Sequence, residues 1–99
     1  MQQGKPHRVA RDDHRSIENR LRGLLASTLG LARKTVDAFE VDTELFGALP
    51  EFDSMAVATL LTGIEEEFDV LIEDDDVEAE DFLTFGALSA FVERLAARA

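Results

Sequence analysis

The chain has 99 residues, of which 21 are acidic, 10 are basic and none is cysteine, and its formal net charge is −11. This length suits one small domain, and the lack of cysteine excludes disulfides, thiolate metal sites and a cysteine nucleophile. The acidic balance argues against nucleic-acid binding, and no apolar run approaches the roughly 20 residues that span a bilayer, so we expect a monomeric cytoplasmic protein without membrane contact.

The N-terminal segment is expected to lie outside the folded domain. Residues 1–15 are polar, contain Gly4 and Pro6 and lack apolar periodicity, which predicts a mobile tail followed by one helical domain over residues 16–99. His7 and His14 fall in or beside this tail and are interpreted as solvated side chains rather than metal ligands. We predict no metal site.

A first helix is predicted over residues 16–29, with Ser16 as its N-cap and Gly30 as its stop signal. The apolar residues of this stretch recur at helical spacing. Residues 30–52 carry apolar side chains at irregular spacing and are expected to form a long loop that these side chains pin to the core. Loops of this length usually have a function.

The second helix is predicted from Asp53-Ser54 to about Phe68. At about 100° per residue, one stripe of this helix is apolar and should face the core. Met55 lies on the opposite, solvent-facing side, next to Ser54. Gly63 lies inside the helix and is expected to mark a close backbone approach. The apolar stripe consists of Val57, Leu60, Leu61, Ile64 and Phe68.

The end of this helix opens a strongly acidic segment. Residues 65–81 contain eleven carboxylates and no basic side chain. Residues 1–34 carry a net charge of +5 and residues 35–99 one of −16, so a partner that docks on the acidic segment should be basic. Asp74-Asp75-Asp76 lacks the Gly and Glu positions of an EF-hand loop, so we expect a solvated acidic loop there, with loose binding of divalent ions as the alternative.

A short helical turn is predicted near residues 80–83, and Thr84 is expected to cap the last helix. Arg94 and Arg98 lie near the C-terminus of that helix, where they suit the negative end of its dipole. No alternating strand pattern longer than four residues occurs. The fold class is therefore predicted as all-α, a small right-handed bundle of three main helices plus one short helix.

Ser54 is the first candidate for a functional residue. A serine at the start of a helix is most often an N-cap, whose hydroxyl accepts a backbone N–H. A serine hydrolase is set aside because the two histidines lie in or beside the tail, and a serine nucleophile needs a base within hydrogen-bond reach. Ser54 therefore cannot easily activate itself, and a modification of Ser54 would need a base from another protein.

Three features occur together around this helix. Asp53-Ser54-Met55 begins an amphipathic helix after a long anchored loop, and Glu65-Glu66-Glu67-Phe68-Asp69 ends it, within an acidic three-helix chain. This combination resembles the acyl carrier proteins over residues 16–97. The family pattern is Asp-Ser-Leu at the start of the second helix, then an apolar stripe, then an acidic end that finishes with Phe.

The resemblance implies that Ser54 carries a 4'-phosphopantetheine arm, which a Mg²⁺-dependent phosphopantetheinyl transferase transfers from coenzyme A. Acyl groups would then be carried as thioesters on the terminal thiol, and a carrier of this kind would catalyse no reaction itself. Asp53 would help to present Ser54 to the transferase, and a phosphodiester there would lie at a helix N-terminus, which favours anions.

The resemblance also implies partner and cargo sites. Partners would be an acyl-CoA or acyl carrier ligase, a synthase or an acyltransferase with a basic docking surface. The expected docking residues are Met55, Glu65, Glu66 and Asp69, and the residues expected to line an acyl pocket, if the core opens, are Leu60, Leu61, Ile64 and Phe68.

The sequence also departs from the family pattern. The family commonly has Gly two residues before the Asp and acidic residues two and five after the Ser, where this chain has Glu51, Ala56 and Thr59. We therefore expect a specialised carrier. One string resembles the carriers associated with exosortase and exopolysaccharide clusters: Gly47-Ala48-Leu49-Pro50-Glu51-Phe52-Asp53-Ser54-Met55-Ala56-Val57.

Two alternatives to an acyl carrier remain. An aminoacyl or peptidyl carrier would use the same arm, although Asp53 and the net charge count against it. An unmodified helical interaction module would use the acidic face and Met55 for docking alone, and would gain no adduct.

Overall fold

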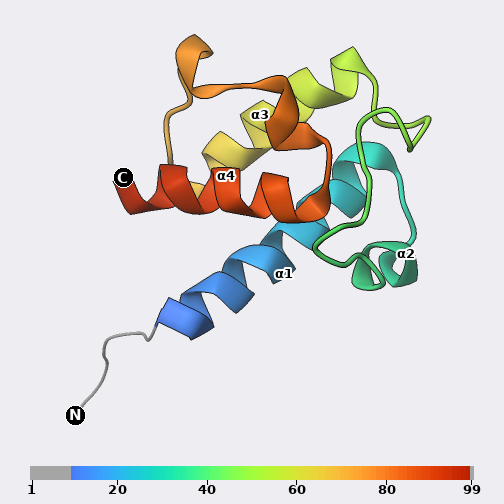
Figure 1. Cartoon of the computed structure of the whole chain (residues 1–99), viewed down its shortest axis with the longest axis horizontal. Helices are drawn as coiled ribbons and strands as arrows, with labels where there is room; N and C mark the ends of the chain where they lie inside the picture. The colour runs from blue at the N-terminus through green and yellow to red at the C-terminus, as the bar shows by residue number, and fades with distance from the viewer. Residues whose placement is uncertain (1–9, 99) are drawn as a thin grey trace.

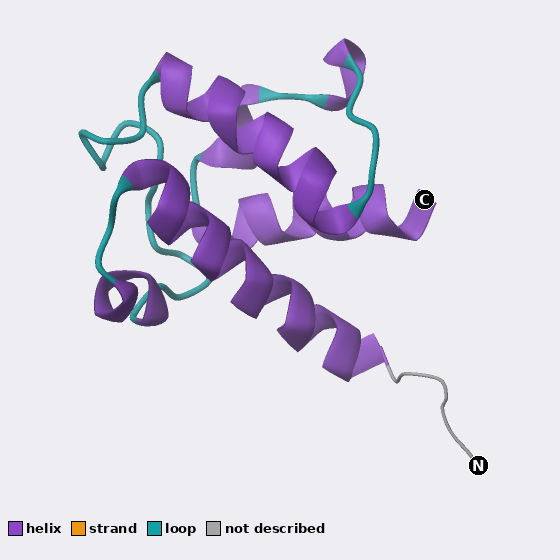
Figure 2. Ribbon diagram, turned by 180° about the vertical axis from the view of Figure 1, so that it is seen from behind, coloured by secondary structure: helices purple, strands orange, loops and turns teal. Residues whose placement is uncertain are grey.

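The computed structural model describes residues 10–98, which form helices and connecting loops without a named strand (Figures 1 and 2). The three long helices are α1 (Ala10–Leu29), α3 (Ser54–Phe68) and α4 (Phe85–Arg98), and the short helix α2 spans Arg33–Asp37. Two 3₁₀ turns, η1 (Asp74–Asp76) and η2 (Ala79–Phe82), lie between α3 and α4. The predicted all-α fold is confirmed. None of the helices described is long and apolar enough to cross a membrane.

Helix α1 begins earlier than predicted. It starts at Ala10, so Ser16 lies inside the helix and is not its N-cap, and the expected boundary between tail and domain falls within α1. The apolar periodicity marks only the part of a helix that faces the core, whereas the first turns of α1 extend beyond the body of the molecule (Figure 1). The rest of the predicted tail, residues 1–9, lies outside the described residues.

One cluster of buried apolar side chains forms the core, and all three long helices contribute to it. Leu21 and Leu25 of α1 and Leu60 and Ile64 of α3 have no exposed surface. Helices α1 and α3 pack closely at Gly63, where an added Cβ would lie 2.8 Å from Cδ1 of Leu24. The atoms that approach Gly63 belong to the Leu24 side chain, so the predicted close backbone approach is found only as a contact with a side chain.

The loop between α1 and α3 contains one element that the sequence did not predict, the five-residue helix α2. Arg22 of α1 holds this region, because its Nη1 donates to the carbonyl oxygens of Val36 at 2.6 Å and Phe39 at 2.9 Å. The guanidinium also lies 4.6 Å from the ring centroid of Phe85. A basic residue of the N-terminal third thus has an internal structural role.

The second half of this loop pairs with the start of α4. The N–H of Leu45 donates to the carbonyl of Leu83 at 2.8 Å, and the N–H of Gly86 donates to the carbonyl of Val41 at 2.8 Å. A single antiparallel bridge joins Glu44 to Thr84. The loop that leads to α3 is therefore fixed by backbone hydrogen bonds as well as by the predicted apolar contacts.

The two C-terminal arginines bind carboxylates of the acidic segment, in addition to lying near the negative end of the helix dipole. Arg94 Nη2 lies 3.1 Å from Asp81 Oδ1, and Arg98 donates to both carboxylate oxygens of Asp76 at 2.9 Å. The hydrogen bonds from Arg98 lower the pKa of Asp76 to about 2. Thr84 caps α4 as predicted, because its Oγ1 accepts the N–H of Ala87.

Candidate functional site

The N-terminus of α3 exposes Ser54 as the first residue of the helix. Asp53 is the N-cap, with an extended backbone, and its Oδ1 accepts the N–H of Ala56 at 2.9 Å. The interpretation of Ser54 as the cap is therefore wrong. Because the Asp53 carboxylate makes the capping bond, the Ser54 hydroxyl takes no part in it. Ser54 lies at the end of the helix where the first N–H groups have no partner within the helix.

The position of Ser54 distinguishes it from the other serines. The sequence has four serines, and the structure describes all of them. Ser16 and Ser27 lie inside α1, and Ser89 is buried in α4 with 2% of its surface exposed. Ser54 alone among them is exposed at the start of a helix, where the positive end of the helix dipole and unpaired N–H groups favour a phosphate group.

A cavity of about 260 Å³ lies directly beside Ser54. Its lining is mostly apolar and comes from three parts of the chain: the loop before α3, the first turn of α3, and the segment from Val77 to η2. Phe82 is buried, and its ring packs edge-on against Phe52, which in turn meets Phe46 edge-on. The lining residues are Phe46, Ser54, Val57, Val77, Ala79 and Phe82.

The four residues predicted to line an acyl pocket lie elsewhere on α3. Leu60 and Ile64 are fully buried in the core, and Leu61 and Phe68 are partly buried against it. None of them lines the cavity beside Ser54. Only Val57 of the predicted apolar stripe does so, because it lies one turn from the serine. Contact of the four deeper residues with a cargo stays a prediction.

The predicted docking residues differ in how accessible they are. Met55 is 79% exposed, and Glu66 and Asp69 are also exposed. Glu65 is half-buried, and its Oε2 accepts the N–H of Ile72 at 2.8 Å. The structure therefore gives Glu65 a role in holding the loop after α3, where the backbone of Asp69 turns into the left-handed conformation with φ of 55°.

Between Ser54 and Glu66, the exposed face of α3 carries no charge. Met55, Ala58, Thr59 and Thr62 follow at helical spacing along this face, and all four are exposed. The hydroxyl groups of Thr59 and Thr62 donate to the carbonyl oxygens of Met55 at 3.1 Å and Ala58 at 3.3 Å. We call these four residues the uncharged stripe.

Comparison with known proteins shows what this chain is similar to. The family model described as a phosphopantetheine attachment site matches residues 19–92. The chain is similar to the holo acyl carrier protein of Nitrosomonas europaea, solved in solution by NMR, with 37% identity and a TM-score of 0.70. That similarity covers 79% of this chain and 92% of the other. No curated protein matches the sequence.

Proposed function

This chain belongs to the family of proteins with a phosphopantetheine attachment site, and on that premise we propose that Ser54 is the residue that carries the 4'-phosphopantetheine arm. The protein is an acyl carrier and not an enzyme. The observation that carries the proposal is the exposure of Ser54 at the first position of α3, with Asp53 as the cap. No other serine of the chain has this combination.

The residues around Ser54 suit a covalently attached phosphodiester. Asp53 caps the first turn of α3, so the Ser54 hydroxyl is not needed for capping and is available for modification. The first N–H groups of α3 provide donors for the phosphate oxygens. When attached, the arm supplies the thiol that a chain without cysteine lacks, and acyl groups are carried on it as thioesters.

Peptide mapping tests the assignment of the site. The protein is incubated with coenzyme A, Mg²⁺ and a phosphopantetheinyl transferase, digested and analysed by tandem mass spectrometry. We expect one adduct, on Ser54, with Ser16 and Ser27 unmodified as internal controls because both lie inside α1. An adduct on either control serine would overturn the assignment.

We propose that the cavity beside Ser54 shelters part of the acyl chain. Its volume of about 260 Å³, its apolar lining and its position next to the attachment point support this role. Each methylene buried there gains roughly 0.8 kcal/mol. Ala79→Leu narrows the cavity, so we expect acylation to raise Tm less in this variant than in the wild type, whereas an equal rise would contradict the pocket assignment.

We propose that partners dock on two neighbouring surfaces: the uncharged stripe, which includes Met55, and the carboxylates of Glu66 and Asp69. The partner is the phosphopantetheinyl transferase or an acyl-handling enzyme with an apolar groove beside Ser54 and basic groups about 20 Å farther along α3, since a helix rises 1.5 Å per residue. Contact through carboxylates weakens with salt, whereas contact through Met55 does not.

The transferase reaction also tests this docking surface. We expect Met55→Asp to lower kcat/KM at every salt concentration, and the double variant Glu66→Gln with Asp69→Asn to lower it only at low salt. Equal kcat/KM for all three proteins at low salt would contradict the surface, while modification of the wild type would still support Ser54 as the attachment site.

Two uncharged residues after Ser54, Thr59 of the uncharged stripe and Ala56 outside it, support the proposal of a specialised carrier. Ala56 and Thr59 remove the charges that general fatty-acid partners are expected to use, and the string from Gly47 to Val57 favours the type associated with exosortase and exopolysaccharide clusters. The proposal includes a cytoplasmic location, since coenzyme A and the transferase are intracellular. Loading assays with acyl and aminoacyl ligases test the cargo, and preferential aminoacylation would favour a peptidyl carrier instead.

A further inference from the structure

The cavity beside Ser54 has an open end and a closed end. Ser54 is exposed and Phe46 is 39% exposed, so these two residues mark its mouth. Phe82 is the most buried of the lining residues, with 4% of its surface exposed, and it therefore forms the inner wall. An acyl chain that enters beside Ser54 meets the ring of Phe82 at the end of its path.

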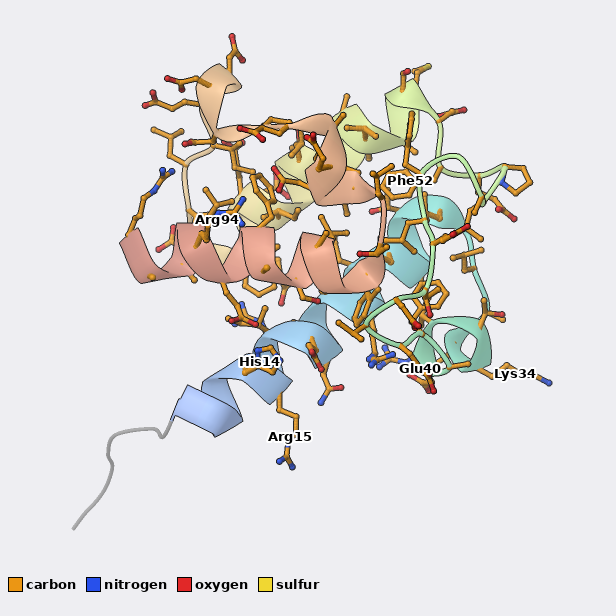
Figure 3. The ribbon with its side chains drawn as sticks, in the orientation of Figure 1. His14, Arg15, Lys34, Glu40, Phe52 and Arg94 are labelled. Carbon is orange, nitrogen blue, oxygen red and sulfur yellow. The ribbon has the colours of Figure 1, made fainter. Side chains whose placement is uncertain are left out.

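Two further aromatic rings pack against the ring of Phe82. Its centroid lies 6.3 Å from that of Phe52 and 5.9 Å from that of Phe91. Phe52 comes from the loop just before α3 (Figure 3), and Phe91 belongs to α4. These two side chains are 2% and 1% exposed, and neither lines the cavity. Because closely packed side chains admit no extra group without moving, the cavity ends at Phe82.

Hydrogen bonds hold this wall in place. The N–H of Phe46 donates to the carbonyl oxygen of Phe82 at 3.0 Å, which ties the mouth of the cavity to its inner wall. Within η2, Oδ2 of Asp81 accepts the N–H of Glu78 at 3.1 Å, and Oδ1 accepts from Nη2 of Arg94 at 3.1 Å. The segment that carries Phe82 is therefore fixed both to the loop before α3 and to α4, so we expect the wall to keep its position when a chain enters.

The lining also defines the kind of chain that fits. None of the six lining residues is charged, and all except Ser54 are apolar. An ammonium group buried in this cavity would lack a partner, which costs free energy, whereas the methyl end of an alkyl chain would not. An apolar cavity of about 150 Å³ binds benzene, which has six carbons, so a volume of about 260 Å³ corresponds at the same density to roughly ten carbons.

We propose that Phe82 sets the length of the acyl chain that this carrier shelters, with uncharged chains of up to about ten carbons as its cargo class. This inference rests on the proposed attachment of the arm to Ser54. Each carbon within the limit is buried in the cavity, whereas carbons beyond it stay in water. Phe82 is a specificity residue and takes part in no chemical step.

Thermal unfolding of a series of acylated proteins tests the limit. The transferase attaches acyl-phosphopantetheine from acyl-coenzyme A to the full chain, with unbranched acyl groups from acetyl to palmitoyl, and peptide mapping confirms the adduct on Ser54. We expect Tm to rise by about 1–3 °C per carbon, up to roughly eight to ten carbons, and then to stay constant. The 6-aminohexanoyl group should raise Tm less than the hexanoyl group, because its ammonium stays in water.

The variant Phe82→Leu tests the role of the wall. Leucine has three fewer carbons than phenylalanine, so we expect the plateau to be reached about three carbons later. The variant should be less stable, and each acylated form is therefore compared with the unacylated form of the same variant. Phe39→Leu is the matched control, because Phe39 is 7% exposed, packs against Phe85 and does not line the cavity. It should lower Tm and leave the plateau unchanged.

Several results would overturn the role of Phe82 while the adduct on Ser54 still supported the proposed function. They are a wild-type Tm that keeps rising up to palmitoyl, a Tm that does not change with chain length, an equal rise for the hexanoyl and 6-aminohexanoyl groups, and the same plateau in the wild type and Phe82→Leu. The absence of an adduct on Ser54 would instead overturn the proposed function, and this inference with it.

Discussion

The carboxylate of Asp53 accepts the backbone N–H of Ala56 at 2.9 Å, and this hydrogen bond caps the helix that begins with Ser54. The functional and structural roles are thus divided between adjacent residues. The aspartate satisfies the helix terminus, and the serine keeps its hydroxyl exposed at the positive end of the helix dipole.

Loss of the cap should destabilise α3. We expect Asp53→Ala to lower the free energy of unfolding by about 1 kcal/mol, because one N–H of the first turn loses its acceptor. Asp53→Asn is the matched control, since asparagine caps helices about as well as aspartate and should cost only a few tenths of a kcal/mol. Urea unfolding measures both, and equal losses in the two variants would show that the charge matters rather than the cap.

Two adjacent glutamates of α3 should respond differently to truncation. Glu65→Ala removes the acceptor of the Ile72 N–H in a partly buried position, and should cost about 1–2 kcal/mol. Glu66→Ala changes an exposed side chain and should stay within about 0.5 kcal/mol. Thermal unfolding of both variants measures the difference, and similar Tm values for the two would contradict the structural role of Glu65.

Two helical glycines offer a second comparison. A Cβ at Gly86 would lie 2.6 Å from the backbone oxygen of Val41, so Gly86→Ala must move the loop and should cost about 1–3 kcal/mol. A Cβ at Gly63 meets only the flexible tip of Leu24, and the gain in helix propensity of about 1 kcal/mol offsets that contact. We therefore expect the free energy of unfolding to fall clearly in Gly86→Ala and to change little in Gly63→Ala. A larger loss for Gly63→Ala would contradict this packing.

The pair between Asp76 and Arg98 should be visible by NMR titration. The pKa of Asp76 is lowered from 3.8 to about 2 by its hydrogen bonds with Arg98. A carboxyl group whose pKa is lower in the folded protein than in the unfolded chain stabilises the fold at pH values above its unfolded pKa. This contribution disappears as the pH falls from about 4 toward 2. In Arg98→Gln we expect the carboxyl of Asp76 to titrate closer to 3.8. An unchanged midpoint would show that Arg98 does not bind this carboxylate in solution.

The sequence predicted the elements whose signals are local. The apolar stripe of α3, its start after Asp53 and the Thr84 cap of α4 are all patterns within a few residues, and the structure has each of them. Helix α2 has five residues and one buried side chain, Val36, so it offers no periodicity to detect. The early start of α1 was missed for the related reason that its first turns lie beyond the buried stripe.

The residues missed at the site are those brought together by tertiary structure. The cavity beside Ser54 takes Phe46, Val77, Ala79 and Phe82 from loops and a 3₁₀ turn, where side-chain direction does not follow a fixed period. The partners of Arg22 and Arg98 lie in other parts of the fold, and His14 contacts Glu93 of α4 as well as Glu18 of its own helix. Charge patterns along the chain indicate that such pairs can form, but the fold decides which ones do.

Intact mass is the most direct measurement of the central claim, that one arm is attached at Ser54. Wild type and Ser54→Ala are treated in parallel with coenzyme A, Mg²⁺ and a phosphopantetheinyl transferase. The account predicts that the wild type gains the mass of a single phosphopantetheine group and that Ser54→Ala, folded as judged by circular dichroism, gains none. A wild type without added mass, or a Ser54→Ala variant that is modified equally well, would contradict it.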